Sequence, residues 1–151
     1  MSHKTKRIAL LLILAASVFG SGALHAESIM PALHTTMRTM RAALVQIGEF
    51  AKGNGEQSAA LDAATKLVML AKSIPALFPP GSELTELPTK SVAPPTTWDD
   101  VDRFLDAHKR LVIETSKLLT VVKDGNTKLT SQQLANTRKA CSACHDQFRD
   151  E

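Results

Sequence analysis

The sequence predicts an all-α protein: an antiparallel four-helix bundle with a left-handed twist and a long proline-rich connection between the second and third helices. Four segments show apolar residues recurring at intervals of three and four, and none shows the sustained alternation of a strand. Aromatic residues make up only 4% of the chain, which also favours helix over sheet. At 151 residues and 44% hydrophobic, the chain has the size and apolar content of one globular domain.

The first 26 residues have the features of a secretory signal peptide. Met1–Arg7 carries three basic residues and no acid, Ile8–Phe19 is apolar, and small residues follow. A spanning helix needs about 20 apolar residues, so we expect no stable membrane anchor. We expect cleavage after Ala26, with a cut after Ala23 as the alternative, and export of a single domain over residues 27–151.

This signal peptide also accounts for the basic charge of the chain. The formal charge is +3, from 18 basic and 15 acidic residues, but residues 1–26 hold three of the basic residues and no acid. The mature chain therefore carries 15 of each sign, and no cluster of Lys and Arg interleaved with aromatic residues remains. These observations argue against nucleic acid as a partner.

The first helix is predicted from Met30 to Ala51, with Ser28 as its N-cap and Pro31 in its first turn. Gly53 follows its last apolar residue and favours a helix end, because glycine readily adopts the left-handed conformation.

The second helix is predicted from about Ser58 to Ile74, where Pro75 stops it. Residues 75–97 then hold six of the seven prolines and form the long connection.

The third helix is predicted to begin at Thr97 as N-cap, with acidic residues in its first turn, and to end at Lys123 and Gly125. The fourth is predicted to begin with a capping box over residues 130–133, in which Thr130 is the N-cap. Its apolar stripe ends at Phe148 and includes Cys141 and Cys144.

Residues 141–145 form the pentapeptide Cys-Ser-Ala-Cys-His, the C-x-x-C-H signature of c-type haem attachment. Cys141 and Cys144 are spaced to form thioethers with the two vinyl groups of one porphyrin, and His145 can supply an axial imidazole to the iron. The sequence therefore predicts one covalently bound haem c.

Three other interpretations of the two cysteines fit less well. A thioredoxin-like dithiol belongs at a strand-to-helix turn, and no strand is predicted. A zinc site needs more ligands, and only His34 and His108 remain, on other helices. A disulfide across two intervening helical residues would be strained. We expect His108 to be a hydrogen-bonded histidine at the edge of the core.

The chain resembles the class II c-type cytochromes, the cytochrome c-prime group and its low-spin relatives. The resemblance rests on residues 140–149 around the C-x-x-C-H motif, on 74–79 and on 47–53, and it spans Met30 to Arg149. This family places the motif near the C-terminus of a four-helix bundle, which the resemblance implies here too. Together with the signal peptide, it predicts a periplasmic protein that transfers electrons to and from redox partner proteins. We see no paired acid and base groups beside an open site in the sequence, so we do not expect an enzyme.

The resemblance further places Met37 at the position that faces the iron opposite His145. In low-spin members a methionine there binds iron, so we expect Met37 as the second axial ligand, ahead of Met40 and His34. In c-prime members an apolar side chain shields five-coordinate iron, which then binds NO or CO. That second function stays open at this point.

The family also commonly has basic residues near the haem propionates. Arg138, one turn before Cys141, and Arg41, one turn after Met37, are the candidates for contact with these carboxylates. Many members have arginine four residues before the distal position, whereas this chain has Leu33. Members of the family also dimerise through helix faces, and the sequence leaves monomer and homodimer open.

Overall fold

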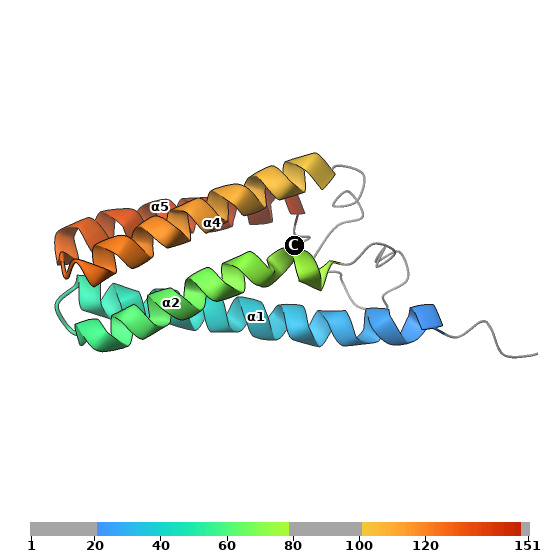
Figure 1. The fold of residues 1–151 in the computed structure, drawn as a ribbon, viewed down its shortest axis with the longest axis horizontal. Helices are drawn as coiled ribbons and strands as arrows, with labels where there is room; N and C mark the ends of the chain where they lie inside the picture. The colour runs from blue at the N-terminus through green and yellow to red at the C-terminus, as the bar shows by residue number, and fades with distance from the viewer. Residues whose placement is uncertain (1–20, 79–100, 149–151) are drawn as a thin grey trace, which may run out of the picture.

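The computed structural model describes residues 21–78 and 101–148, which form four long helices and one short 3₁₀ helix (Figure 1). The helices are α1 (Ser21–Ala51), α2 (Gln57–Ser73), α4 (Val101–Lys123) and α5 (Thr127–Phe148), and η1 (Ile74–Leu77) follows α2 directly. No strand occurs within these residues. The predicted all-α four-helix fold is confirmed.

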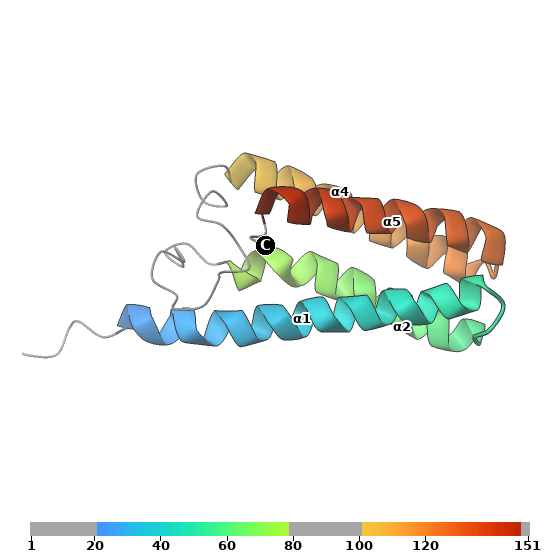
Figure 2. The same ribbon diagram turned by 180° about the vertical axis from the view of Figure 1, so that it is seen from behind.

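The helices form two hairpins that pack side by side (Figures 1 and 2). α1 and α2 form one hairpin, α4 and α5 form the other, and α2 contacts α4 while α1 contacts α5. Each helix runs antiparallel to both of its neighbours, and both tight turns lie at the same end. None of the described helices combines the length and the apolar character needed to cross a membrane.

The start of the first helix was wrongly predicted. α1 begins at Ser21, so Ser28 lies inside the helix and is not an N-cap, and Pro31 also lies within the helix, beyond its first turn. The capping preference of Ser is weak compared with the continuous helical propensity of the residues before it. The expected cleavage after Ala26 would bring Pro31 back close to the helix start. Residues 1–20 of the predicted signal peptide lie outside the described part.

The predicted N-cap of the last helix is also wrong by one turn. α5 begins at Thr127, and the side-chain oxygen of Asn126 accepts a hydrogen bond from the Leu129 N–H at 2.9 Å. Thr130 lies inside the helix, fully buried, and its hydroxyl donates to the Val121 carbonyl at 3.4 Å. The Thr130 hydroxyl faces α4, so the cap is provided by Asn126, whose side chain is also preferred over threonine at this position.

The other helix ends agree with the sequence. α1 ends at Ala51 before Gly53, which has φ of +81°, and α4 ends at Lys123 before Gly125, which has φ of +71°. The second helix begins one residue earlier than predicted and ends at Ser73, with η1 over the next four residues. The predicted cap at Thr97 and the connection beyond Phe78 lie outside the described residues.

The core runs along the axis of the bundle, and α2 contributes mostly small residues to it. Six α2 residues are buried, four of them alanines, listed as Ala60, Ala63, Ala64, Leu67, Val68 and Ala71. Alanines let the neighbouring helices approach α2 closely, and the larger side chains of those helices fill the space between them. The result is one continuous core that α1, α2, α4 and α5 all share.

Polar contacts join the helices at both edges of this core. The Gln57 side-chain amide donates to the carbonyls of Val122 and Lys123 at 3.1 and 3.0 Å, so the start of α2 caps the end of α4. Between α4 and α5, the Gln133 amide donates to the Glu114 carboxylate at 2.6 Å and to its carbonyl at 3.1 Å. The bonds of Gln57 join the two hairpins, and those of Gln133 hold the α4–α5 hairpin closed.

Candidate functional site

The C-x-x-C-H motif forms the last two turns of α5. Cys141 and Cys144 lie one helical turn apart, are half-buried, and are free thiols that pack against the core. Burial raises the pKa of both thiols; the neighbouring Cys141 adds to the rise at Cys144, while the charge of Arg138 opposes it at Cys141. His145 follows directly and is also half-buried.

Three aromatic rings hold this end of α5 against the rest of the bundle. Phe104 of α4 packs edge-to-face on Phe148 of α5, with ring centroids 5.6 Å apart, and on Phe78, at 5.2 Å. All three side chains are buried. Because Phe148 lies one turn after the motif, this packing fixes the direction of the turn that carries Cys144 and His145.

The face of α1 that meets α5 can be identified at Gly48. A Cβ atom at Gly48 would lie 3.5 Å from a methyl of Leu134 and 3.6 Å from a guanidinium nitrogen of Arg138, both on α5. Residues 37, 41, 44 and 48 recur at intervals of four, three and four, so they share one face of the helix. Met37 and Arg41 therefore lie on the α5-facing side of α1.

The antiparallel register also brings Met37 level with His145. Gly48 lies opposite the turn between Leu134 and Arg138. Met37 is eleven residues from Gly48, and His145 is about nine from the middle of that turn, so at 1.5 Å per residue their heights along the bundle differ by only about 3 Å. The ribbons of α1 and α5 diverge toward this end (Figure 2).

The other candidate axial ligands are placed less favourably. Met40 is 4% exposed and is part of the packed core, whereas Met37 is half-buried and packs at its edge. His34 is exposed on α1. A ring nitrogen of His108, Nε2, lies 3.0 Å from the Ala71 carbonyl, which confirms the hydrogen-bonded role predicted for this histidine.

The two arginines predicted near the propionates lie along the seam between α1 and α5. Arg138 is exposed, and its guanidinium reaches across to Gly48 of α1. Arg41 is exposed on the same face of α1 as Met37. Leu33, at the position where the family often has arginine, is 2% exposed and belongs to the core. Contact of Arg138 and Arg41 with the haem propionates stays a prediction.

These residues fit a covalently attached haem. Two thiols one turn apart, each protonated at neutral pH, can add across two vinyl groups, since S–H addition to C=C places the sulfur on one carbon and the hydrogen on the other. The imidazole of His145 follows the second thiol, and the sulfur of Met37 lies on α1 at about the same height along the bundle. No other pair of cysteines exists in the chain.

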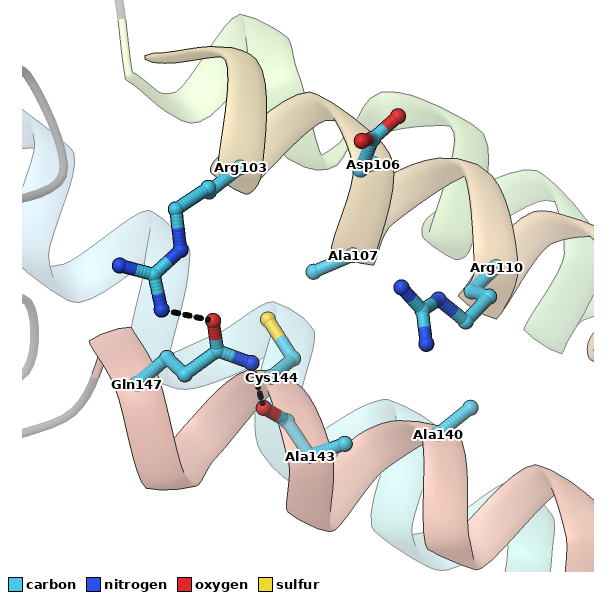
Figure 3. Close-up of a pocket in the computed structure, with 8 residues that line it drawn as sticks. All are labelled: Arg103, Asp106, Ala107, Arg110, Ala140, Ala143, Cys144 and Gln147. Atoms are coloured by element: carbon cyan, nitrogen blue, oxygen red, sulfur yellow. Dashed lines mark hydrogen bonds between the residues drawn. The ribbon is translucent and has the colours of Figure 1, made fainter. Parts of the chain in front are cut away.

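A groove beside Cys144 was missed by the sequence analysis. It lies between α4 and α5 and is lined by Arg103 and Arg110 of α4 and by Ala140, Ala143 and Gln147 of α5, among others (Figure 3). The available signal was the seven-residue spacing of the two arginines, which places them on one face of α4. Sequence alone does not tell which neighbouring helix that face meets.

Comparison with known proteins agrees with a covalently attached haem. The family model described as Cytochrome C' matches residues 30–149. The chain is similar to cytochrome c-556 of Agrobacterium tumefaciens (strain II Chrys), with 31% identity over 87 residues, 58% of this chain. The match spans 66% of that relative's length, just under two thirds.

The fold is similar to solved cytochromes c'. A nitric oxide complex of a cytochrome c prime variant from Alcaligenes xylosoxidans has a TM-score of 0.73 at 19% identity, covering 83% of this chain and 97% of that one. A cytochrome c' described by its ligand-controlled dimer dissociation has a TM-score of 0.76 at 18% identity, with the same coverage. At these identities the likeness shows the fold.

Proposed function

The chain belongs to the cytochrome c' family and carries covalently attached haem c, and on that premise we propose that it is a periplasmic electron-transfer protein with two axial ligands. It acts as a carrier between redox partner proteins and not as an enzyme. The signal peptide over residues 1–26 would direct its export. A measured mass of the mature protein that corresponds to a chain beginning at Glu27 would support that step.

In this proposal each residue of the site has one role. Cys141 and Cys144 anchor the cofactor through thioethers, so that an exported carrier cannot lose it. His145 binds the iron from α5, and Met37 binds it from α1. The bound group supplies a one-electron redox couple, and the protein's contributions are the ligand pair, the apolar surroundings and the nearby charges.

Assignment of Met37 is supported above all by its place on the α5-facing side of α1, about level with His145. A thioether there is a soft ligand that stabilises ferrous iron, and a histidine–methionine pair raises the reduction potential relative to a site without methionine. Arg41, on the same face of α1, and Arg138, on α5, are proposed to contact the propionates.

Replacing Met37 by leucine tests the ligand directly. Leucine has nearly the same volume but no sulfur, so the fold should be preserved within about 1.5 kcal/mol. We expect the sharp low-spin spectrum of the reduced protein to become a broad high-spin one. Met40→Leu is the matched control and should stay low-spin. A high-spin spectrum in the native protein would overturn the Met37 assignment.

A gas-binding function is the second candidate. The solved nitric oxide complex of a similar fold favours it, and Met37 would then only shield the distal side of five-coordinate iron. In that case the native protein is high-spin and Met37→Ala binds CO faster without a change in the resting spectrum. Another cytochrome c' of similar fold is described by a ligand-controlled dimer dissociation, so we also expect a homodimer here. Analytical ultracentrifugation of the holoprotein measures this oligomeric state.

A further inference from the structure

The end of α2 is shaped by a proline that removes one helical hydrogen bond. In a continuous helix the N–H of residue 75 would donate to the carbonyl of Ala71, but Pro75 has no N–H. The N–H of Ile74 donates to the Ala71 carbonyl instead, and the Ser73 hydroxyl donates to the Leu70 carbonyl at 2.9 Å. The helix therefore changes at this point into the 3₁₀ turn of η1.

A side chain of α4 reaches the same carbonyl. Nε2 of His108 lies 3.0 Å from the oxygen of Ala71, a residue that is fully buried. A carbonyl oxygen accepts hydrogen bonds and has two lone pairs, so the ring nitrogen is the donor and occupies the lone pair that the Ile74 N–H leaves open. His108 thus supplies, from a neighbouring helix, the donor that Pro75 lacks.

This hydrogen bond lies next to the aromatic cluster that holds the end of α5. His108 follows Phe104 by one helical turn, so both side chains project from α4 toward the end of α2. Phe104 packs on Phe78, which directly follows η1, and on Phe148, which follows the haem motif. The Phe78 N–H donates to the Pro75 carbonyl at 3.1 Å, so the position of the Phe78 ring depends on the same turn.

We propose that His108 is a positioning residue for the haem: its bond to the Ala71 carbonyl fixes the junction of α2 and η1 against α4. The aromatic cluster around Phe104 then connects this junction to the turn of α5 that carries His145. Groups behind an iron-bound histidine set its orientation. The proposal concerns the His145 side of the haem and goes beyond the proposed function, because it holds whether or not Met37 binds the iron.

The test replaces His108 by glutamine and by asparagine in the holoprotein. The amide nitrogen of glutamine stands at the reach of the histidine Nε2 and that of asparagine at the reach of Nδ1, so only His108→Gln keeps the donor in place. We expect amide hydrogen exchange of residues 145–148 to stay within about twofold of native in His108→Gln and to be roughly fivefold to tenfold faster in His108→Asn. Residues 127–134, at the other end of α5, should keep native exchange in both variants.

Pro75→Ala provides the second arm of the test, because it returns an N–H that can donate to the Ala71 carbonyl along the helix. In that background the difference between asparagine and glutamine at position 108 should shrink to less than about twofold. An undiminished difference would overturn the proposal, as would native exchange of residues 145–148 in His108→Asn. An equal acceleration along the whole of α5 would overturn it too, since His108 would then serve overall stability and not this turn.

The native protein can be tested without any substitution. Nitrogen-15 NMR of the neutral His108 ring should show a hydrogen on Nε2 and none on Nδ1, and the opposite tautomer would overturn the proposal.

The hyperfine shifts of the haem methyl signals report the orientation of the axial imidazole. Their pattern should change in His108→Asn and stay native in His108→Gln. An identical pattern in both variants would overturn the connection from His108 to His145.

Discussion

Gly48 lies buried in α1, opposite Leu134 and Arg138 of α5, and offers a sharp test of the packing between these helices. A glycine inside a helix costs about 1 kcal/mol relative to alanine, because it loses more backbone entropy on folding. An added Cβ would meet its nearest neighbours at 3.5 and 3.6 Å, which are ordinary van der Waals distances. Gly48→Ala should therefore stabilise the protein by about 0.5 to 1 kcal/mol.

The assay is thermal unfolding of the ferric holoprotein followed by far-ultraviolet circular dichroism. A gain of this size should raise Tm by roughly 2 to 6 °C for a domain of this length. Gly53→Ala is the matched control, because Gly53 has φ of +81° and no atom within 4 Å of an added Cβ. Its substitution should destabilise the protein by about 1 kcal/mol through backbone strain alone.

Loss of stability in Gly48→Ala would refute the reasoning, since it would mean that α1 and α5 approach more closely at Gly48 than described. A shift in the absorption spectrum of Gly48→Ala would have a different meaning. It would show that the spacing of the two helices at Gly48 controls the ligands several turns away. We expect the spectrum to be unchanged, because the added methyl fills existing space.

Two further results are expected. Gln57→Ala removes the hydrogen bonds to the Val122 and Lys123 carbonyls and should cost about 1 kcal/mol in urea unfolding, whereas equal stability would mean that water replaces the amide fully. In haem-free chain, Cys141 and Cys144 should be alkylated by iodoacetamide only at higher pH than in urea-unfolded chain, because burial raises the pKa of both thiols. Because the thiol pKa values are raised in the folded chain, the contribution of these thiols to folding stability is complete below the usual thiol pKa. It is lost as the pH rises through the pKa values of the folded chain. Alkylation profiles that coincide for folded and unfolded chain would contradict the raised pKa values.

The helices were predictable from sequence because their buried residues recur with helical spacing. Phe104, Leu111 and Leu118 of α4, for example, recur at intervals of seven residues and are all buried. Helix starts were less predictable because several residues near each start can serve as a cap. Asn126 and Thr130 both have suitable side chains, and the choice depends on which one faces α4, a tertiary property.

The site could be predicted only as far as its local part. Cys141, Cys144 and His145 form a contiguous motif, so their chemistry is visible in the sequence itself. The relation of Met37 to His145 depends on the register of two helices that are more than 100 residues apart in sequence. The groove at Arg110 depends in the same way on which helix α4 meets, so neither could be obtained from periodicity alone.

The position of the motif at the end of α5 also has an electrostatic consequence. α5 ends at Phe148, so His145 lies in its last turn, where unpaired carbonyls give the helix macrodipole its negative end, equivalent to about half an electron charge. That fixed partial charge favours a positively charged centre beside it. Ferric iron carries one positive charge more than ferrous iron, so with His145 as its proposed ligand the dipole of α5 would lower the reduction potential, while the guanidinium group of Arg110 would act in the opposite direction.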